Sequence, residues 1–223
     1  MTNILNMINI VIPMAGLGSR FKDAGYIKPK PFIDVNGVSM IERVLKNLYI
    51  PNSRFILIGR QEHIDEESIT VEKIKFKYKN TIFIGINKLT EGTVCTILYA
   101  KSYIDNDSPL LIANSDQIVD INIQDFISDS KQKKVDGSIL SFYDNDLNPK
   151  WSFIKINKDN NVIEVKEKEA ISNIATVGIY FFNNGKDFIN AYEKYKNSNL
   201  VIDISEILKD SNIKIKYIDE FHY

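Results

Sequence analysis

Apolar residues in the first half of the chain follow two patterns that alternate along the sequence. One is a continuous run rich in β-branched side chains, which is typical of a strand buried in a parallel sheet. The other repeats every three or four positions, as in residues 41–48 and 94–100, and is typical of a helix. Ser39 precedes the first helical segment and is a candidate N-cap. This alternation predicts βαβ units and a mostly parallel sheet, with strands at residues 8–14, 54–59, 81–86 and 109–113.

The pattern changes after residue 134. Strand-like segments then follow one another with little helix between them, at residues 137–143, 151–156, 162–165 and 176–182. This indicates a smaller mixed-sheet lobe that binds a second ligand. Near the end of the sequence we expect a helix at residues 186–195, a shorter helix from about Ile204 and a strand at residues 213–218. We therefore predict an α/β fold and a single domain over residues 1–223, with functional parts at residues 1–134 and 135–223.

Composition and charge limit the classes of partner. The chain has 223 residues, of which 44% are hydrophobic and 26% charged, as in an ordinary globular domain. Its net charge of −1 gives no general attraction to nucleic acid or to an anionic membrane, so we expect neither as a partner. No apolar run is long enough to span a bilayer, and the opening residues lack the basic region and cleavage site of a signal peptide. We expect a cytoplasmic protein.

Cysteine and histidine are too few to build a metal site from these two residue types. Cys95 is the only cysteine, and His63 and His222 are the only histidines. These counts exclude a disulfide framework and argue against a zinc site. Cys95 has the spacing of an apolar residue on a helix face, and neither histidine has a partner visible in the sequence. We assign none of the three a catalytic role.

The segment after the first strand has the features of a phosphate-binding loop. Gly16 and Gly18 allow positive φ and close backbone approach, so that consecutive N–H groups can surround an anion. Arg20 adds a fork of donors, and Lys30 lies between two prolines that stiffen the backbone. A Walker A loop would end in Gly-Lys-Ser/Thr, and a dinucleotide fingerprint would have a third glycine where Phe21 stands. A plain tight turn is the remaining alternative, and the two cations favour phosphate binding over it.

Two further polar segments follow predicted strands. Asp116 comes just after the strand at residues 109–113, at the sheet edge where open α/β sheets bind ligands. A carboxylate there suits Mg²⁺, although an Asx turn is the alternative. The segment Thr90-Glu91-Gly92-Thr93 precedes the helix at residues 94–100, so Thr90 or Thr93 is a candidate N-cap and Gly92 a site of close approach.

Together these motifs resemble the sugar-nucleotide pyrophosphorylase, or nucleotidyltransferase, family. The resemblance is carried by Gly16-x-Gly18-Ser19-Arg20, Ala24-Gly25-Tyr26 and Pro29-Lys30-Pro31. It covers nearly the whole chain and is strongest in the first half. It implies a Rossmann-like sheet of the GT-A type and an enzyme that joins a nucleoside monophosphate to a small phosphorylated acceptor and releases pyrophosphate. No covalent intermediate or general base is needed, because the acceptor phosphate is already anionic.

The resemblance also implies roles for individual residues. Arg20, Lys30 and Asp116 would be catalytic, with Arg20 at the β- and γ-phosphates, Lys30 at the α-phosphate and Asp116 holding Mg²⁺. Asp203 would be a second metal ligand, although it is equally well placed to cap the helix from Ile204. The nucleotide would lie against Met14, Ala15, Gly16, Leu17, Gly18, Ser19, Arg20, Lys30, Thr90, Glu91, Gly92, Thr93 and Ser115. This chain has Asn-Ser-Asp at residues 114–116, where many relatives have Gly-Asp, and Asp203 lacks the usual preceding Thr.

A second group of residues would bind the acceptor. By the same resemblance Lys168 contacts the acceptor phosphate and Glu167 the acceptor body, ahead of a strand that contains Gly178. From the residues alone, the charges at residues 164–168 favour a solvated strand face. The proline that usually follows the lysine is replaced by Glu169. Trp151, the only tryptophan, either lines the acceptor pocket or packs against the sheet.

Within the family the chain is most similar to small enzymes of capsule and surface-polysaccharide clusters. That likeness implies CTP as the nucleotide and an acceptor that need not be a sugar, with L-glutamine phosphate as one candidate. A hexose-1-phosphate uridylyl- or guanylyltransferase is the first alternative. A GT-A glycosyltransferase typically needs Asp-x-Asp, and residues 114–116 supply one carboxylate. A non-catalytic nucleotide-binding module is the third, and the joint presence of Arg20, Lys30 and Asp116 argues against it. No hexapeptide repeats follow, so we expect no fused acyltransferase.

Overall fold

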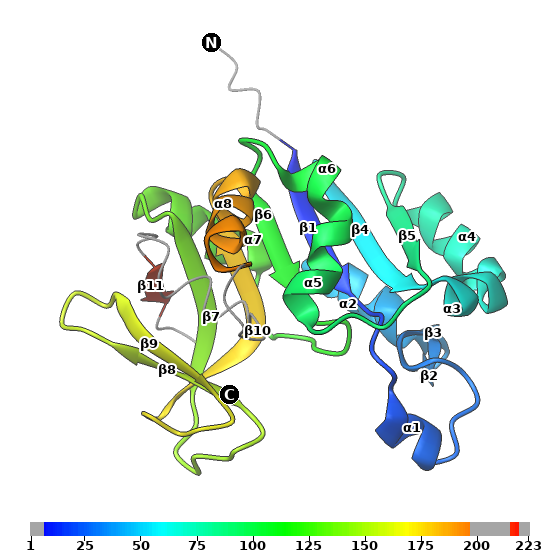
Figure 1. Cartoon of the computed structure of the whole chain (residues 1–223), viewed down its shortest axis with the longest axis horizontal. Coiled ribbons are helices and arrows are strands. Elements are labelled where there is room, and N and C mark those ends of the chain that lie inside the picture. The colour runs from blue at the N-terminus through cyan, green and yellow to red at the C-terminus, as the bar shows by residue number, and fades with distance from the viewer. Residues whose placement is uncertain (1–6, 197–214, 219–223) are drawn as a thin grey trace.

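The computed structural model describes residues 7–196 and 215–218. Their main feature is one nine-stranded mixed sheet, in which the strands lie in the order β11-β7-β10-β6-β1-β4-β5 and β8 and β9 branch from β10 (Figure 1). The strands are β1 (Ile8–Pro13), β4 (Ser53–Arg60), β5 (Ile82–Ile86), β6 (Leu110–Ala113), β7 (Gly137–Tyr143), β8 (Ser152–Ile156), β9 (Val162–Glu167), β10 (Ile174–Phe182) and β11 (Ile215–Ile218). A separate short hairpin joins β2 (Asp34–Val35) to β3 (Val38–Ser39).

Strand direction divides the sheet into two regions. β1 pairs in parallel with β4 and β6, and β4 with β5, as the apolar runs predicted. β10 runs antiparallel to β6, β7 and β8, and β8 and β9 form an antiparallel hairpin. The predicted α/β class with a mostly parallel mixed sheet is confirmed, and the strands of the second half extend that same sheet.

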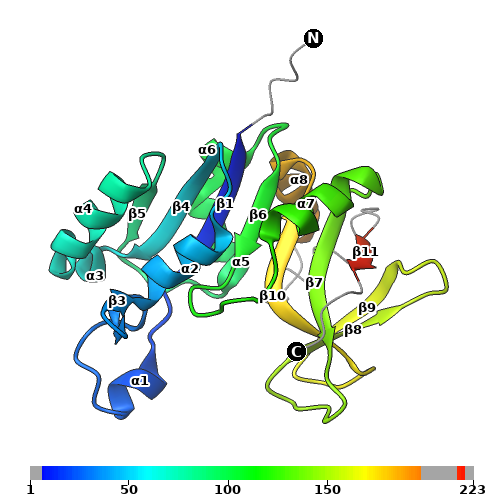
Figure 2. The ribbon, with the colours of Figure 1, turned by 180° about the vertical axis from the view of Figure 1, so that it is seen from behind.

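Helices cover both faces of the sheet. Figure 1 shows α5, α6 and α8 in front of it, and Figure 2, from behind, shows α2 and α7 on the other face. Because neighbouring side chains on a strand point to opposite faces, Ile10 and Ile12 of β1 pack with α2 while Val11 packs with α5. The helices are α1 (Ser19–Asp23), α2 (Met40–Leu48), α3 (Gln61–Glu66), α4 (Ser68–Lys77), α5 (Thr93–Ile97), α6 (Lys101–Ile104), α7 (Ile123–Gln132) and α8 (Gly185–Tyr195).

Helix boundaries match the sequence predictions in part. Ser39 caps α2 as predicted, because its Oγ accepts the backbone N–H of Glu42 at 3.4 Å. The helix predicted at residues 94–100 is α5 followed by a 3-10 turn over Leu98–Ala100. Helix α7 was not predicted, although Asn122 caps it by accepting the N–H of Gln124 at 3.0 Å. The helix predicted from Ile204 lies outside the described residues.

The parallel pairing of β1 with β6 places two loops at one edge of the sheet. Val11 pairs with Ile112, so the residues that follow the two strands, 14–20 and 114–116, leave the sheet side by side. Segments from both halves of the chain project beyond this edge, α1 on one side and the β8–β9 hairpin on the other (Figure 1). No helix in the described part of the chain has the length and apolar character needed to cross a membrane.

Candidate active site

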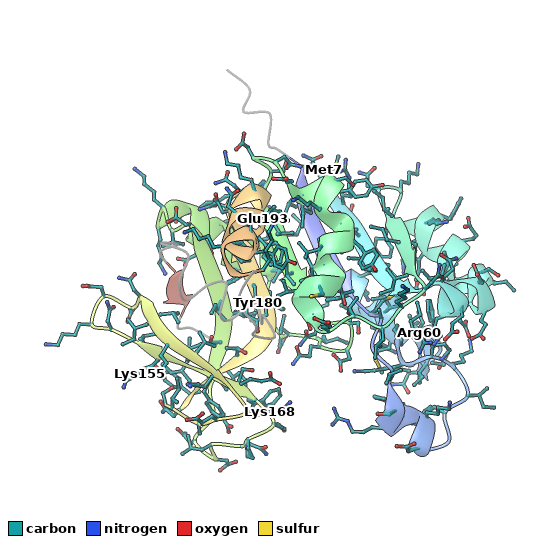
Figure 3. The ribbon with its side chains drawn as sticks, in the orientation of Figure 1. Met7, Arg60, Lys155, Lys168, Tyr180 and Glu193 are labelled. Atoms are coloured by element: carbon teal, nitrogen blue, oxygen red, sulfur yellow. The ribbon has the colours of Figure 1, made fainter. Side chains whose placement is uncertain are left out.

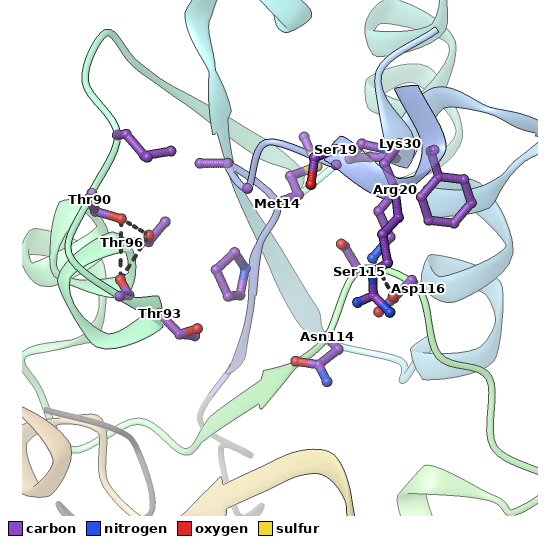
Figure 4. Close-up of a pocket in the computed structure, with 18 residues that line it drawn as sticks. Met14, Ser19, Arg20, Lys30, Thr90, Thr93, Thr96, Asn114, Ser115 and Asp116 are labelled. Atoms are coloured by element: carbon purple, nitrogen blue, oxygen red, sulfur yellow. Dashed lines mark hydrogen bonds and ion pairs between the residues drawn. The ribbon is translucent and has the colours of Figure 1, made fainter. Parts of the chain in front are cut away.

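A cavity of about 490 Å³ lies at this edge of the sheet. Four segments form its wall: the loop after β1, the 3-10 turn at Lys30–Phe32, the segment from Leu89 to the first turn of α5, and the residues that follow β6 (Figure 4). The lining residues are Pro13, Met14, Ala15, Gly16, Gly18, Ser19, Arg20, Phe21, Lys30, Pro31, Leu89, Thr90, Gly92, Thr93, Thr96, Asn114, Ser115 and Asp116.

The loop after β1 has the geometry of an anion site. Gly18 has φ +61° and stands directly before α1, and a Cβ there would lie 3.1 Å from the Cβ of Lys30. Gly16, which was also expected to use its conformational freedom, does not have a positive φ, because the left-handed turn into α1 is made at Gly18 alone. Within the described residues, no protein hydrogen bond uses the backbone N–H groups of residues 15–18. These N–H groups are therefore available to an anionic ligand.

Opposite charges from distant parts of the chain meet in the cavity. The ammonium of Lys30 forms an ion pair with Oδ2 of Asp116 and lies 5.5 Å from the centre of the Phe21 ring. In the described residues the Asp116 carboxylate has no Asx-turn hydrogen bond, so its partner is the lysine. Figure 4 shows Arg20 beside this pair, at the far end of the cavity from Thr90 and Thr93. Two positive side chains against one negative give the cavity a net positive charge suited to a polyanion.

At the opposite end of the cavity, the hydroxyl groups of Thr90 and Thr96 contact each other and the main chain of Gly92. Gly92, rather than Thr90 or Thr93, is the N-cap of α5, and it has no side-chain capping bond, so the predicted threonine cap is wrong. The Oγ1 atoms of Thr90 and Thr96 each lie 3.2 Å from the carbonyl oxygen of Gly92 and 2.6 Å from each other. The Thr90 hydroxyl is therefore turned toward this carbonyl instead of toward the N–H groups of the first helical turn.

The structure brings most of the predicted nucleotide-binding residues to this one cavity. Leu17 and Glu91 are exposed and do not line it. Six lining residues were not among the predicted site residues: Pro13, Phe21, Pro31, Leu89, Thr96 and Asn114. Asn114 directly precedes the predicted Ser115 and Asp116, so its position in the sequence could have indicated it. Thr96 could not be found in this way, because its spacing is that of a residue on an apolar helix face.

The nucleotidyl transferase family matches residues 10–220 of the chain. The protein belongs to this family. Among curated relatives, the bifunctional protein GlmU of Methanococcus aeolicus is 28% identical over 214 residues, which cover 93% of this chain and 48% of that protein. GlmU of Methanocaldococcus jannaschii is 25% identical, with the same coverage. The chain therefore spans about half the length of the curated relatives it matches.

Solved structures share the fold of this nucleotidyltransferase. A nucleoside-diphosphate-sugar pyrophosphorylase from Vibrio cholerae RC9 aligns with a TM-score of 0.75 and 25% identity, over 93% of this chain and 90% of that one. An inositol-1-phosphate CTP transferase from T. maritima aligns with a TM-score of 0.72 and 17% identity, over 96% of this chain and 85% of that one. The second likeness concerns the fold alone.

Three of the four residues predicted to bind an acceptor lie together in this nucleotidyltransferase, away from the wall of the cavity, and the N–H of Lys168 donates to the carbonyl oxygen of Trp151 at 3.0 Å. Lys168 pairs with Glu167 at 2.6 Å, both are exposed, and neither lines the cavity. Figure 3 shows Lys168, which directly follows β9, across the molecule from Arg60. Trp151 packs edge-on against Phe142 at 5.3 Å between ring centres, which is the packing alternative. The acceptor roles of Glu167, Lys168 and Trp151 stay predictions.

Gly178 lies behind the cavity instead of in its wall. It has φ +74° at an irregularity in the pairing of β10 with β7, and its carbonyl accepts the N–H of Asn114 at 3.2 Å. A Cβ at this position would lie 2.1 Å from Nδ2 of Asn114, which in turn donates to Gln117 at 2.8 Å. Gly178 therefore makes room for the Asn114 side chain in the cavity wall.

The residues that line the cavity include one that could hold the predicted Mg²⁺ ion. Asp116 is the only acidic residue that lines it, and the described residues contain no cluster of three or more His, Cys, Asp and Glu side chains that could hold a metal ion. Asp203 lies outside the described residues. A single carboxylate beside an anion loop fits Mg²⁺, which is commonly held by one or two carboxylates together with substrate phosphates.

Proposed function

We propose that this nucleotidyltransferase transfers a nucleoside monophosphate from an NTP, with CTP preferred, to a small phosphorylated acceptor and releases pyrophosphate. The observation that carries the proposal is the meeting of Arg20, Lys30 and Asp116 in one cavity with the open N–H groups of residues 15–18. No single segment of the sequence supplies this set. It combines donors for a triphosphate with a carboxylate for its metal ion.

The geometry supports a direct displacement at the α-phosphorus. Arg20 and the loop N–H groups hold the β- and γ-phosphates, and Lys30 stabilises the charge that builds at the α-phosphate. An acceptor phosphate oxygen attacks the α-phosphorus in line, the bond to the bridging oxygen breaks, and pyrophosphate leaves with that oxygen. Because the attacking oxygen is already anionic, positioning and charge neutralisation are sufficient.

Asp116 is the residue that would hold Mg²⁺ in this site. A bound Mg²⁺ supplies Lewis-acid neutralisation of the phosphate oxygens. In the structure the carboxylate pairs with Lys30. Arrival of the NTP gives Lys30 a phosphate partner, and that exchange leaves the Asp116 carboxylate available to the metal ion. Asp203 is proposed as the second ligand.

The choice of CTP follows from the likeness to capsule-cluster enzymes. A pocket that accepts the cytosine amino group on a backbone carbonyl would leave two acceptors facing each other if uracil were bound. An unpaired buried polar group costs about 1–3 kcal/mol, so we expect CTP to be favoured over UTP by roughly 10- to 100-fold in kcat/KM. The acceptor need not be a sugar, and L-glutamine phosphate in the biosynthesis of a capsule or other surface polysaccharide is the favoured candidate.

A hexose-1-phosphate uridylyl- or guanylyltransferase is the second candidate. It is favoured by the alignment with the nucleoside-diphosphate-sugar pyrophosphorylase, at 25% identity over 93% of the chain. The two candidates share the mechanism above and differ in the nucleobase and the acceptor.

Pyrophosphate release decides between the candidates. Each of the four NTPs is combined with L-glutamine phosphate, polyol phosphates and hexose-1-phosphates, with and without Mg²⁺. We expect the fastest Mg²⁺-dependent release with CTP and an acceptor that is not a hexose. UTP, dTTP or GTP working best with a hexose-1-phosphate would overturn the cytidylyl assignment and support the second candidate. No acceptor-dependent release from any NTP would overturn the nucleotidyltransferase proposal.

A further inference from the structure

Thr96 occupies an unusual place in the wall of the cavity. It is 5% exposed, on a helix whose neighbouring residues Val94 and Ile97 are fully buried apolar side chains. A hydroxyl in such surroundings needs a hydrogen-bond partner, because an unpaired buried polar group is costly. Its partners lie on the loop that lines the cavity, opposite the phosphate-binding end (Figure 4).

Three oxygen atoms meet at this point. The Thr96 Oγ1 donates to the carbonyl oxygen of Gly92, four residues back, at 3.2 Å, and the backbone N–H of Thr96 donates to the same carbonyl at 3.1 Å. Thr90 Oγ1 reaches this carbonyl at 3.2 Å and the Thr96 hydroxyl at 2.6 Å. Two hydroxyl hydrogens are thus distributed over three short contacts, which tie Thr90, Gly92 and Thr96 into one closed group.

This group limits what the loop can offer to a ligand. The Gly92 carbonyl already accepts from the protein and is not free to read a base edge. If the phosphates bind at the end with Arg20 and Lys30, the base lies at this end. Its recognition then falls to other main-chain groups of the segment 89–92, whose positions depend on how firmly Gly92 is held. A rigid loop discriminates between bases that differ by one donor or acceptor, whereas a loosened loop adapts to either.

We propose that Thr96 and Thr90 are positioning residues that set the nucleobase selectivity of this enzyme by clamping the Gly92 carbonyl. The proposal rests on the proposed function, because it takes the cavity to be the NTP site. Neither hydroxyl needs to contact the nucleotide. Each acts through the main chain of the loop.

Isosteric variants test the clamp. Thr96→Val and Thr90→Val each keep the branched shape and remove one hydroxyl, and Thr96→Ser keeps the hydroxyl and loses a methyl group. Dissociation constants for CTP and UTP are measured by calorimetry, together with KM and kcat for pyrophosphate release. A net hydrogen bond is worth about 0.5–1.5 kcal/mol, so we expect each valine variant to bind the preferred nucleotide about 2- to 10-fold more weakly.

The pattern across measurements separates a clamp from general destabilisation. We expect the ratio of the CTP and UTP dissociation constants to move toward one in Thr96→Val. It should come still closer to one in the variant that combines Thr96→Val with Thr90→Val. We also expect kcat to change by less than about 2-fold and Thr96→Ser to restore the wild-type ratio. Thr70→Val is the matched control, because it removes a hydroxyl that donates to Glu67 at 3.2 Å on α4, outside the cavity. It should leave the ratio unchanged.

Failure of the clamp and failure of the proposed function give different results. A wild-type enzyme that binds one base preferentially, with an unchanged ratio in Thr96→Val, would overturn the clamp alone, even if the melting temperature falls. A preference for UTP would overturn the cytidylyl assignment. The clamp would then be tested in the same way, by whether the ratio of the two dissociation constants moves toward one in Thr96→Val. Wild-type protein that binds neither nucleotide would overturn both.

Discussion

The position of Lys30 in the cavity is set by residues next to it in the sequence and by residues from distant parts of the chain. Pro29 and Pro31 flank it in a 3-10 turn, and Gly18 leaves just enough room for its side chain. Its ammonium then meets Asp116, which is 86 residues away in sequence. The lysine is therefore placed by the fold to meet a phosphate, and its contribution should be electrostatic rather than structural.

We predict that Lys30→Ala lowers kcat by about 100-fold or more, the size expected when one pre-organised donor is lost. The melting temperature should change little, because a half-buried ion pair contributes about 1 kcal/mol or less. Steady-state pyrophosphate release and thermal unfolding measure the two quantities. Lys101→Ala is the control, since it removes an ion pair with Glu193 at 2.9 Å that lies outside the cavity. Wild-type turnover in a folded Lys30→Ala protein would remove this lysine from the mechanism.

We predict that Asp116→Asn abolishes the dependence of NTP binding on Mg²⁺ and reduces turnover severely. The substitution keeps the shape of the side chain and removes the charge that a hard divalent cation requires. Calorimetric titration of CTP with and without Mg²⁺ measures the effect, and Asp107→Asn, which disrupts an ion pair with Lys186 away from the cavity, is the control. Near-normal activity with full Mg²⁺ dependence would show that Asp116 is not the metal ligand.

At the level of secondary-structure elements, the part of the molecule that carries the site is stabilised by a buried charge. Glu42 of α2 is 3% exposed and meets Lys77 at 2.8 Å and Lys73 at 3.3 Å, both on α4. Burial raises the pKa of this carboxyl, but the hydrogen bonds and charges of the two lysines outweigh burial and bring the pKa below its ordinary value. The carboxylate thus joins two helices while charged.

We predict that Glu42→Gln lowers the free energy of unfolding by about 1–3 kcal/mol at neutral pH, since a charge-assisted hydrogen bond is lost in a buried place. A carboxyl whose folded pKa is lowered contributes its full stability above its unfolded pKa, which is near 4.5, and loses that contribution as the pH falls through the folded value. Urea unfolding of both proteins should therefore show a constant difference at pH 6–8 that shrinks below about pH 4.5. A difference that stays constant down to pH 3.5 would contradict this account.

Local sequence signals predicted some elements and failed at others for identifiable reasons. Ser39 was correctly assigned as a cap because its hydroxyl faces the start of α2 and accepts the N–H of Glu42. Thr90 was assigned wrongly because its hydroxyl turns to Gly92 and Thr96, a choice set by packing that spacing does not reveal. Helix α7 was missed although its buried residues Ile123, Phe126 and Ile127 have helical spacing.

For the whole molecule, the order of the strands determines which residues share the site. The apolar runs predicted parallel strands, and general rules for such sheets placed the loops after β1 and β6 at one edge. No local pattern could reveal that β10 inserts between β6 and β7, because strand partners are chosen by long-range packing. That insertion places Gly178 behind Asn114. The sequence analysis therefore singled out this glycine but could not predict that it makes room for a side chain in the wall of the cavity.

The central claim of this account is that the cavity transfers the α-phosphoryl group with its nucleoside, and the fate of labelled phosphate tests this most directly. CTP labelled with ³²P at either the α- or the γ-position is incubated with Mg²⁺, the enzyme and the acceptor that gives the fastest pyrophosphate release. We predict that α-label appears in the acceptor product, that γ-label appears only in pyrophosphate, and that Lys30→Ala slows both processes equally. Appearance of γ-label on the acceptor, or release of α-label as free CMP without acceptor labelling, would contradict it.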